Sequence, residues 1–441
     1  MSNHMNSIGS SRYKRVLSRF LPKHGSARNV ITLMTGTALG QAIPVAISPL
    51  LTRLYSPAEF GVFALYMALV AVLSVLATGR YELAIMVPRS ERSAAAIVAL
   101  AIACCAGVSA LLLLIILVFH DQLVVLFNLA GSTYWLYWVP LSVMLMGANQ
   151  SLNYWCNRHA YYKRMSTTRI AQNTGMSTAH VALGYGGLGM LGLIIGAVLG
   201  YLTAFSLLFL ASGRRKLFTG MSIARMHKMA RRHVDFPKFL VLAHGFNMAS
   251  FQSPVVLLGS FFGSSVAGFF MLTQRVIGAP MSIVAGAIGD VFRQQASERY
   301  ARTGECVALY RKTFVRLLIL SLPPFAVFYV VAPDFFAWVF GEAWRVSGEY
   351  ARVLAPMLFF QFITSPLSCL FFIAGKQRLD LLWQSGLFVT VCGSLVLGGV
   401  SQDVGLALHA FSYGYCILYI INGVMTYRFA KGRGVSLNYG S

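Results

Sequence analysis

Long apolar stretches alternate with short polar ones along most of the chain. A helix needs about 20 apolar residues to cross a bilayer. Windows of that kind fall at 29–52, 60–79, 94–119, 134–153, 170–189, 191–211, 239–260, 266–288, 313–332, 351–373, 380–400 and 404–427. The 170–189 window is the most polar, and we expect it to face protein or water. The pattern therefore predicts an all-α, polytopic membrane protein with about 12 transmembrane helices.

The most polar run lies near the middle, at 213–238, and holds eight Lys or Arg against one acid, Asp235. Because a charge at the bilayer centre costs roughly 2.5–3.5 kcal/mol, this run is predicted to be a cytoplasmic connector. Its part Ile223–Arg232 is predicted to form an amphipathic helix on anionic membrane lipid. The connector separates a basic cytoplasmic segment (1–28) and a six-helix bundle (29–212) from a second six-helix bundle (239–427) and a cytoplasmic tail (428–441).

Composition and charge agree with this layout. The 441 residues are 57% hydrophobic and only 11% charged, whereas soluble domains carry about 25% charged residues. The net charge is +23. With both termini inside, 31 of the 36 Lys and Arg lie in inner segments, and only Arg53, Arg345 and Arg352 lie in outer ones. The charge thus reports membrane topology, by the positive-inside rule, and not a nucleic-acid partner.

An internal repeat links the two halves. Residues 53–65 open the second window and residues 260–272 open the eighth, each with a polar turn, a Gly and an aromatic run. Equal topology in both halves predicts pseudo-twofold symmetry about an axis along the membrane normal, as in transporters with parallel repeats. The prolines Pro44, Pro49 and Pro254 fall in the first helix of each half, where bends are tolerated if the helix lines a cavity.

Arg275 is the deepest ionisable residue in the predicted spans. It lies beside Gln274, about ten residues into the eighth window, where an unpaired Arg is costly unless it faces a partner or water. A guanidinium suits bidentate contact with phosphate. Two readings remain open at this point: a cavity site for an anionic substrate, and a structural ion pair.

Other ionisable residues stand at the ends of spans. Arg80 and Glu82, at the inner end of the second span, form either an interface pair or a cavity site in which Arg80 meets substrate and Glu82 takes a coupling ion. Arg53 is a candidate anion contact on the release side, although the position favours an ordinary interface role. Asp290 and Arg293, at the inner end of the eighth span, are candidates for a gate.

Amides inside the predicted spans offer hydrogen bonds to sugar hydroxyls, and they also hold helices together. Those chosen as candidates for a polar cavity are Gln41, Asn153, Asn247 and Gln252. The seven cysteines and nine histidines show no metal spacing, and no hydrolase, phosphate-loop or metal motif occurs. No cofactor and no enzymatic activity are therefore expected. The longest outer segment is expected at 333–350, with aromatic residues at the outer interface.

Four stretches carry a family resemblance: 51–85, with LTRLYSPAEFGVFALYMALVAVLSVLATGRYELAI, and 157–184, 192–200 and 340–377. Together they resemble Wzx-type O-antigen and exopolysaccharide flippases, in the polysaccharide branch of the multidrug/oligosaccharidyl-lipid/polysaccharide (MOP) exporter superfamily. The resemblance implies a V-shaped pair of six-helix bundles around a cationic cavity. The two extra helices of lipid II flippases are absent.

The resemblance further implies a substrate, an oligosaccharide linked to undecaprenyl pyrophosphate, moved from the inner to the outer leaflet of the bacterial inner membrane. Expected partners are membrane lipids and the polymerase and chain-length components of the pathway. For coupling to H+ or Na+, Glu82 and Asp290 are the candidates. A drug antiporter of the same superfamily remains an alternative that would need buried carboxylates. A membrane polymerase or ligase would need a large outer loop.

Overall fold

The computed structural model describes residues 25–126, 133–212 and 222–432, and within these ranges every regular element is a helix. The first half contains seven α-helices and a 3₁₀ turn: α2 (Gly25–Leu54), α3 (Pro57–Ala77), α4 (Tyr81–Ala84), α5 (Glu91–Leu126), η1 (Tyr134–Trp138), α6 (Val139–Arg158), α7 (Tyr162–Tyr185) and α8 (Met190–Ala211). Between the halves lie α10 (Ile223–Arg232) and the π-helical turn η2 (Phe236–Leu240). The second half contains α11 (Val241–Phe262), α12 (Ser264–Thr273), η3 (Gln274–Gly278), α13 (Ala279–Thr303), α14 (Val307–Phe340), η4 (Glu342–Trp344), α15 (Arg345–Thr364), η5 (Ser365–Leu367), α16 (Leu370–Ile373), α17 (Gln377–Val400) and α18 (Val404–Ala430).

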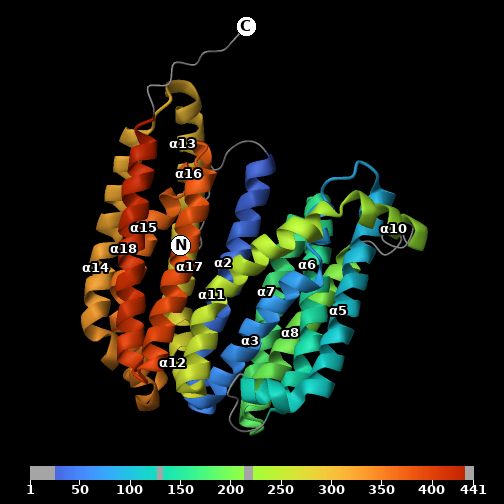
Figure 1. The fold of residues 1–441 in the computed structure, drawn as a ribbon, viewed down its shortest axis with the longest axis horizontal. Coiled ribbons are helices and arrows are strands. Elements are labelled where there is room, and N and C mark those ends of the chain that lie inside the picture. The colour runs from blue at the N-terminus through green and yellow to red at the C-terminus, as the bar shows by residue number, and fades with distance from the viewer. Residues whose placement is uncertain (1–24, 127–132, 213–221, 433–441) are drawn as a thin grey trace, which may run out of the picture.

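The helices form two bundles side by side (Figure 1), which confirms the predicted all-α membrane fold. Eight helices in the described ranges are long and apolar enough to cross a membrane. Four further long helices, α2, α6, α7 and α11, coincide with predicted windows but are less apolar. Twelve spans with both termini inside therefore stay a prediction.

The amphipathic helix predicted in the connector is present as α10, with the same bounds. It lies at the upper end of the first bundle in Figure 1, and we call this the connector end of the molecule. The earlier part of the connector, 213–221, lies outside the described residues, as do most of the N-terminal segment and the end of the tail.

Helix α3 begins at a complete capping box. The Ser56 backbone N–H donates to Glu59 Oε2 at 2.7 Å, and the Glu59 N–H donates to Ser56 Oγ at 3.4 Å. Pro57 fills the first turn, where its missing N–H costs nothing. The sequence therefore sets the start of α3 sharply, at the turn that opens the first repeat copy.

The two repeat copies pack directly against each other at the end opposite the connector. A Cβ placed on Gly61 of α3 would overlap the Ser264 carbonyl oxygen of α12, and one placed on Gly268 would overlap the Pro57 carbonyl oxygen. The contacts are reciprocal, since Pro57 and Ser264, like Gly61 and Gly268, are equivalent positions of the repeat. Glycine lets the two backbones touch here, as small residues do between membrane helices.

Trp344 completes the closure at this end. Its ring is 1% exposed and meets Phe60 edge-to-face at a centroid distance of 5.0 Å, while its Nε1 donates to the Thr52 carbonyl at 3.0 Å. Trp344 belongs to the second half of the chain, and Phe60 and Thr52 to the first. The two bundles are thus held together at the end away from the connector.

The prediction of an outer loop at 333–350 is wrong. Helix α14 continues to Phe340, and α15 begins at Arg345, so that only the short turn η4 separates them. Its aromatic residues also divide: Trp338 is 80% exposed, as an interface residue would be, but Phe336 and Trp344 are buried. Packing between the bundles took precedence over the interface preference of aromatic rings.

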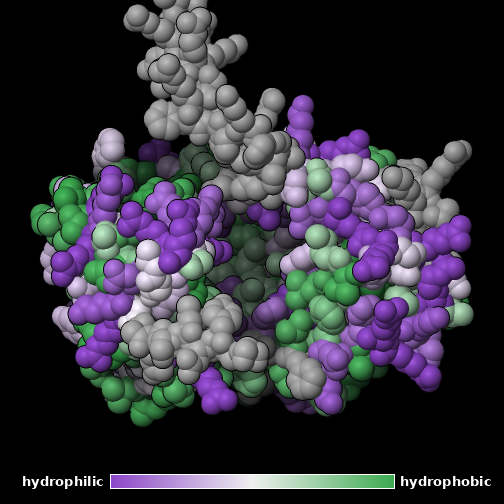
Figure 2. Space-filling model, turned by 90° about the horizontal axis from the view of Figure 1, so that it is seen from above, coloured by the Kyte–Doolittle hydropathy of each residue, from purple (hydrophilic) through white to green (hydrophobic). Residues whose placement is uncertain are grey.

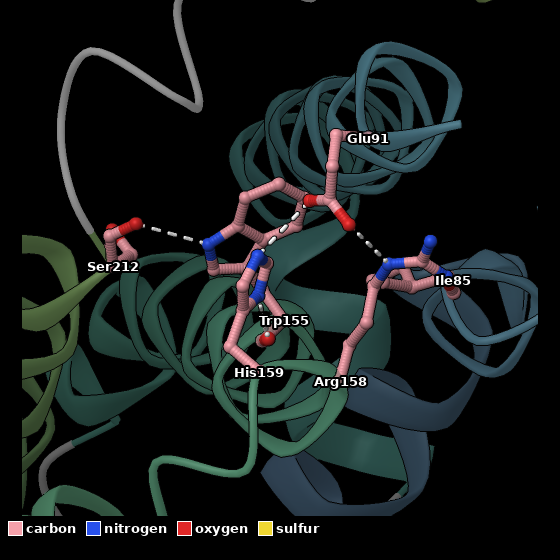
Figure 3. Close-up of polar contacts among 6 residues, drawn as sticks. All are labelled: Ile85, Glu91, Trp155, Arg158, His159 and Ser212. Carbon is pink, nitrogen blue, oxygen red and sulfur yellow. Dashed lines mark hydrogen bonds and ion pairs between the residues drawn. The ribbon is translucent and has the colours of Figure 1, made fainter. Parts of the chain in front are cut away.

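Polar contacts join the connector-end termini of four helices in the first bundle (Figure 3). Glu91 at the start of α5 pairs with Arg158 Nε at 3.3 Å and with His159 Nε2 at 3.0 Å, both at the end of α6. Arg158 also donates to the Ile85 carbonyl at 3.0 Å. Trp155 Nε1 donates to the Ser212 carbonyl, just after α8, at 3.0 Å. These bonds link the ends of the four helices at the connector end of this bundle.

Viewed from the connector end, the molecule is hollowed between its two halves (Figure 2). Hydrophilic residues surround the mouth of the hollow, and its depth is more apolar. The molecule is therefore open at the connector end and closed at the other.

Candidate functional site

A cavity of about 590 Å³ lies between the bundles, and both halves of the chain contribute to its wall. The first half supplies α2 and α7, and the second supplies α11, η3, α13, α15 and η5. The lining includes Gln41, Pro44, Val45, Asn173, Phe251, Gln274, Arg275, Gly278, Ala279, Met281, Ser282, Ala285, Leu358, Gln361, Phe362 and Ser365. Its volume is in the usual range for a ligand site, about 300–1,000 Å³.

Arg275 is placed by an irregular turn. Residues Gln274–Gly278 are π-helical, and Pro280 follows in the first turn of α13. Proline has no N–H to give to the carbonyl four residues earlier, and a widened turn accommodates that loss. Turns of this type are frequent at functional sites. The turn carries two neighbouring polar side chains, Gln274 and Arg275, to the cavity wall.

The Arg275 guanidinium has no carboxylate within 4.0 Å in the described part of the chain. Its contact across the bundles is with Phe60, whose ring centroid lies 5.9 Å from Arg275 Cζ. Such a cation–π contact is worth only about 0.5–2 kcal/mol, less than a buried charge pair. Arg275 is also the one charged side chain in the cavity lining given above. The structure therefore does not provide the ion pair that the structural reading of Arg275 requires.

Four amides line the same cavity as this charge: Gln41, Asn173, Gln274 and Gln361. Gln41 and Gln274 are among the predicted site residues. Asn173 and Gln361 were not, although their presence as amides inside predicted spans was the signal that could have found them. A single cation among amides, with Phe251 on the wall, suits an anion that carries many hydroxyl groups.

Arg80 and Glu82 lie elsewhere, buried beneath the connector end. Arg80 Nη1 and Glu82 Oε1 are 3.1 Å apart, and the Glu82 side chain is fully buried. Arg80 adopts a left-handed backbone conformation, with φ of 57°, which is uncommon for a non-glycine residue. Neither residue lines the Arg275 cavity. In this conformation Arg80 therefore pairs with Glu82 and does not contact a ligand in that cavity.

The Arg80–Glu82 pair leaves hydrogen-bonding capacity unused. Arg80 Nε, Glu82 Oε2, Asn153 Oδ1 and His244 Nδ1 are all buried without a hydrogen-bond partner. His244 lies on α11, the first helix of the second half, and feels both charges of the pair. Buried polar atoms without partners are rare and often mark a bound ion or water.

The other predicted residues are dispersed. Asn247 donates to Gln384 Oε1 at 3.3 Å, so it joins α11 to α17, and Gln252 is half-buried on α11. Arg53 is exposed at the end of α2, and Asp290 and Arg293 are exposed on α13. None of these five lines the Arg275 cavity. Within the described ranges, no group of three or more His, Cys, Asp or Glu is placed to hold a metal ion.

Two comparisons at the level of sequence identify relatives. The family model described as polysaccharide biosynthesis protein matches residues 50–349. The succinoglycan biosynthesis transport protein ExoT of Rhizobium meliloti (strain 1021) is 24% identical over 315 residues, which cover 70% of this chain and 61% of that protein. The chain thus spans about three-fifths of the length of that curated relative.

Solved structures show the same architecture. The lipid II flippase MurJ, in an inward closed conformation, superposes with a TM-score of 0.71 at 12% identity, covering 90% of this chain and 87% of that one. A MOP superfamily transporter from Pyrococcus furiosus, described as having a binding pocket of reverse polarity, superposes with a TM-score of 0.59 at 14% identity, covering 91% and 95%. At these identities the likeness establishes the fold alone. Those proteins are named as transporters and a flippase.

The family match extends over more than half of the chain, and it confirms the resemblance to polysaccharide exporters drawn from the sequence. With its two-bundle fold, the chain belongs to the polysaccharide biosynthesis protein family.

Proposed function

We propose that this protein is a flippase that moves an oligosaccharide linked to undecaprenyl pyrophosphate from the inner to the outer leaflet of the bacterial inner membrane. The observation that carries the proposal is Arg275, a cation without a carboxylate partner, at the wall of an amide-lined cavity between two bundles. Flippase activity is the function named for MurJ, and transport in succinoglycan biosynthesis is that named for ExoT.

The chemistry of the cavity supports an anionic, polar headgroup. A guanidinium in a membrane is costly without a counter-charge, and a pyrophosphate supplies one with matching geometry. Amides such as Gln41 and Gln361 then offer hydrogen bonds to the sugar hydroxyls. The headgroup enters the cavity while the prenyl chain stays in lipid, so the bilayer centre is crossed without exposing charge to hydrocarbon.

The two ends of the molecule support this direction. The connector end carries the basic helix α10 and is the cytoplasmic side by the positive-inside rule. The hollow opens on that side, and the Gly61, Gly268 and Trp344 contacts close the other. This conformation suits loading from the inner leaflet. Rocking of the two bundles about the repeat contacts would close the connector end and open the other.

A drug antiporter is the second candidate, but the positive charge of the Arg275 cavity argues against it. A cationic drug would need a carboxylate in the lining, where the residues named above include none. A polymerase or ligase would need a large outer loop, but between α14 and α15 there is only the short turn η4. Membrane lipids and the polymerase and chain-length components of the pathway are the proposed partners, and H+ or Na+ coupling through Glu82 or Asp290 is part of the proposal.

The proposal is tested in a deletion strain by mass spectrometry of the lipid-linked intermediate, with its leaflet assigned by an impermeant sugar-modifying reagent. We expect complete repeat units on undecaprenyl pyrophosphate that accumulate facing the cytoplasm. Outward-facing repeat units would assign the block to polymerisation, and normal lipid intermediates would contradict any role in the pathway. The mass also names the sugar.

A further inference from the structure

A second cavity, of about 1080 Å³, lies between the connector-end parts of α13 and α14. We call it the basic niche. Four cations line it, Arg299, Arg302, Lys312 and Arg316, against two acids, Glu298 and Glu305. Four positive and two negative side chains leave the niche with a net charge of +2.

The cations of the basic niche are not paired with those acids. No ion pair within 4.0 Å joins any of the four to a carboxylate in the described part of the chain. The neighbouring Arg311 differs, since it points to the other side of α14 and donates to the Tyr427 hydroxyl at 2.9 Å. Arg316 stands inside a predicted span, where a cation needs an anion or water beside it.

An apolar slot of about 360 Å³ continues from the basic niche toward the centre of the molecule. Its walls are Val276, Ile277, Pro280, Met281 and Val284 on one side and Leu320, Ser321, Pro324, Phe325, Phe328 and Phe362 on the other. From Arg316 to Phe328 the helix α14 advances 12 residues, or about 18 Å at 1.5 Å per residue.

The niche and the slot adjoin at Leu320, which lines both. Met281 and Phe362 line both the slot and the Arg275 cavity, so these two residues stand between the slot and the central cavity. A charged end and an apolar continuation thus follow one another along α13 and α14, with the central cavity on another face of the same stretch of α13. This order matches a lipid with its phosphate at the inner interface and its chain directed into the membrane.

Resting on the flippase function above, we propose that this crevice binds the polyprenyl pyrophosphate part of the substrate. The basic niche holds the pyrophosphate before transport, and the slot holds the first isoprenoid units. The headgroup then passes to Arg275 while the chain remains against α13 and α14.

Two observations favour this lipid over a bulk phospholipid. A pyrophosphate diester carries two negative charges, equal to the excess charge of the basic niche, whereas phosphatidylglycerol carries one and phosphatidylethanolamine none. The slot also adjoins the transport cavity, because Met281 and Phe362 line both. A site for structural lipid would not need that proximity.

The test is photo-crosslinking in proteoliposomes with a sugar-free polyprenyl pyrophosphate that carries a diazirine on the isoprenoid unit next to the pyrophosphate. Labelled peptides are mapped by mass spectrometry. We expect labels on α13 and α14 near Val284 and Leu320, and labelling weaker by about fivefold in Lys312→Glu, because this reversal lowers the net charge of the basic niche from +2 to 0. The matched control is Arg378→Glu, an exposed cation at the start of α17, which should label like the wild type.

Unlabelled polyprenyl pyrophosphate should compete for this label, and phosphatidylglycerol at the same concentration should not. Equal competition by phosphatidylglycerol would show a general phospholipid site and overturn the proposal, as would the absence of label from α13 and α14. Failure of the proposed function would be seen separately, in the deletion strain. If the protein moves another substrate, lipid-linked repeat units stay unaffected in that strain, whatever the photo-crosslinking shows.

Discussion

Gly61 and Gly268, 207 positions apart, occupy equivalent places in the repeat and meet at the closed end of the molecule. A side chain on either would overlap a backbone carbonyl of the other repeat copy. The contact lies where α3 and α12 run side by side (Figure 1). Since the two copies touch reciprocally, this pair lies near the axis that relates the halves. Rocking of the bundles would therefore change this contact early in the motion.

Gly268→Ala should therefore destabilise the conformation that is open at the connector end. The added methyl meets the Pro57 backbone, which cannot swing away, and overpacking of this kind costs about 2 kcal/mol. That cost corresponds to a shift of up to about 30-fold between the two conformations. The measurement uses a protein without native cysteines that carries a single cysteine at Ser282, a cavity-lining position. Maleimide added from the connector side should label this cysteine less in Gly268→Ala. Gly286→Ala, where an added Cβ meets nothing within 4 Å, is the control, and equal labelling of the two variants would refute the prediction.

Trp344→Ala should open the end away from the connector. Truncation removes a buried ring and the hydrogen bond to the Thr52 carbonyl, a loss of about 3–5 kcal/mol for a large aromatic residue. Labelling of the same Ser282 cysteine from the outer side should rise, and Trp344→Phe should give an intermediate value because it keeps the contact with Phe60.

The matched control is Trp338→Ala, a residue of the same segment that is 80% exposed. It should label like the parent protein. If both tryptophan variants label equally, Trp344 does not hold the bundles together.

Glu82→Gln alone should lower the stability of the fold more than the double variant Arg80→Gln with Glu82→Gln does. It leaves Arg80 buried without a counter-charge, a change of about 3–5 kcal/mol, whereas Arg80→Gln combined with Glu82→Gln removes both charges. Thermal unfolding in detergent should therefore rank the double variant above Glu82→Gln, with exposed Glu349→Gln near the wild type. A double variant no more stable than the single one would contradict the buried pair.

The same double variant tests Glu82 as the coupling carboxylate. If Glu82 takes up the ion, transport by the folded double variant should no longer respond to an imposed proton or sodium gradient. A response equal to that of the wild type would exclude Glu82 and leave Asp290.

The polar contacts of Figure 3 should differ in strength according to burial. Trp155→Phe loses a hydrogen bond from a fully buried ring and leaves the Ser212 carbonyl unpaired, at about 1–3 kcal/mol. Glu91→Gln weakens bridges whose acid is 55% exposed, which are worth about 1 kcal/mol or less. The melting temperature should therefore fall further for Trp155→Phe than for Glu91→Gln. The reverse order would mean that the Glu91 bridges stabilise the fold more than their exposure implies.

Apolar periodicity and charge alternation predicted the helices well, because a membrane helix must satisfy its own backbone and bury its length in lipid. The repeat at 53–65 and 260–272 could also be seen in the sequence, and it marks the surfaces that pack together. Gln41, Gln274 and Arg275 were chosen as polar residues in spans, and they do share one cavity.

What the sequence could not predict depends on partners distant along the chain. Trp344 looked like an interface aromatic, and only its contact with Phe60 shows that it seals the bundles. Arg80 could be read from the sequence as an interface partner of Glu82 or as a second substrate cation, and the fold places it, buried, on Glu82. The cations from Arg299 to Arg316 counted as topological charge, and their grouping in the basic niche follows from the packing of α13 beside α14.

The most direct test is translocation by Arg275 variants in proteoliposomes loaded with the native lipid-linked repeat unit. The fraction of headgroups that become accessible to an impermeant sugar-modifying enzyme is followed with time. Wild type and the control Arg352→Ala, an exposed cation on α15 outside the cavity lining, should both translocate. Arg275→Lys, which keeps the charge without the fork, should be partly active, and Arg275→Ala should be inactive while still folded. Translocation by Arg275→Ala at the wild-type rate would contradict the anionic cavity on which this function rests.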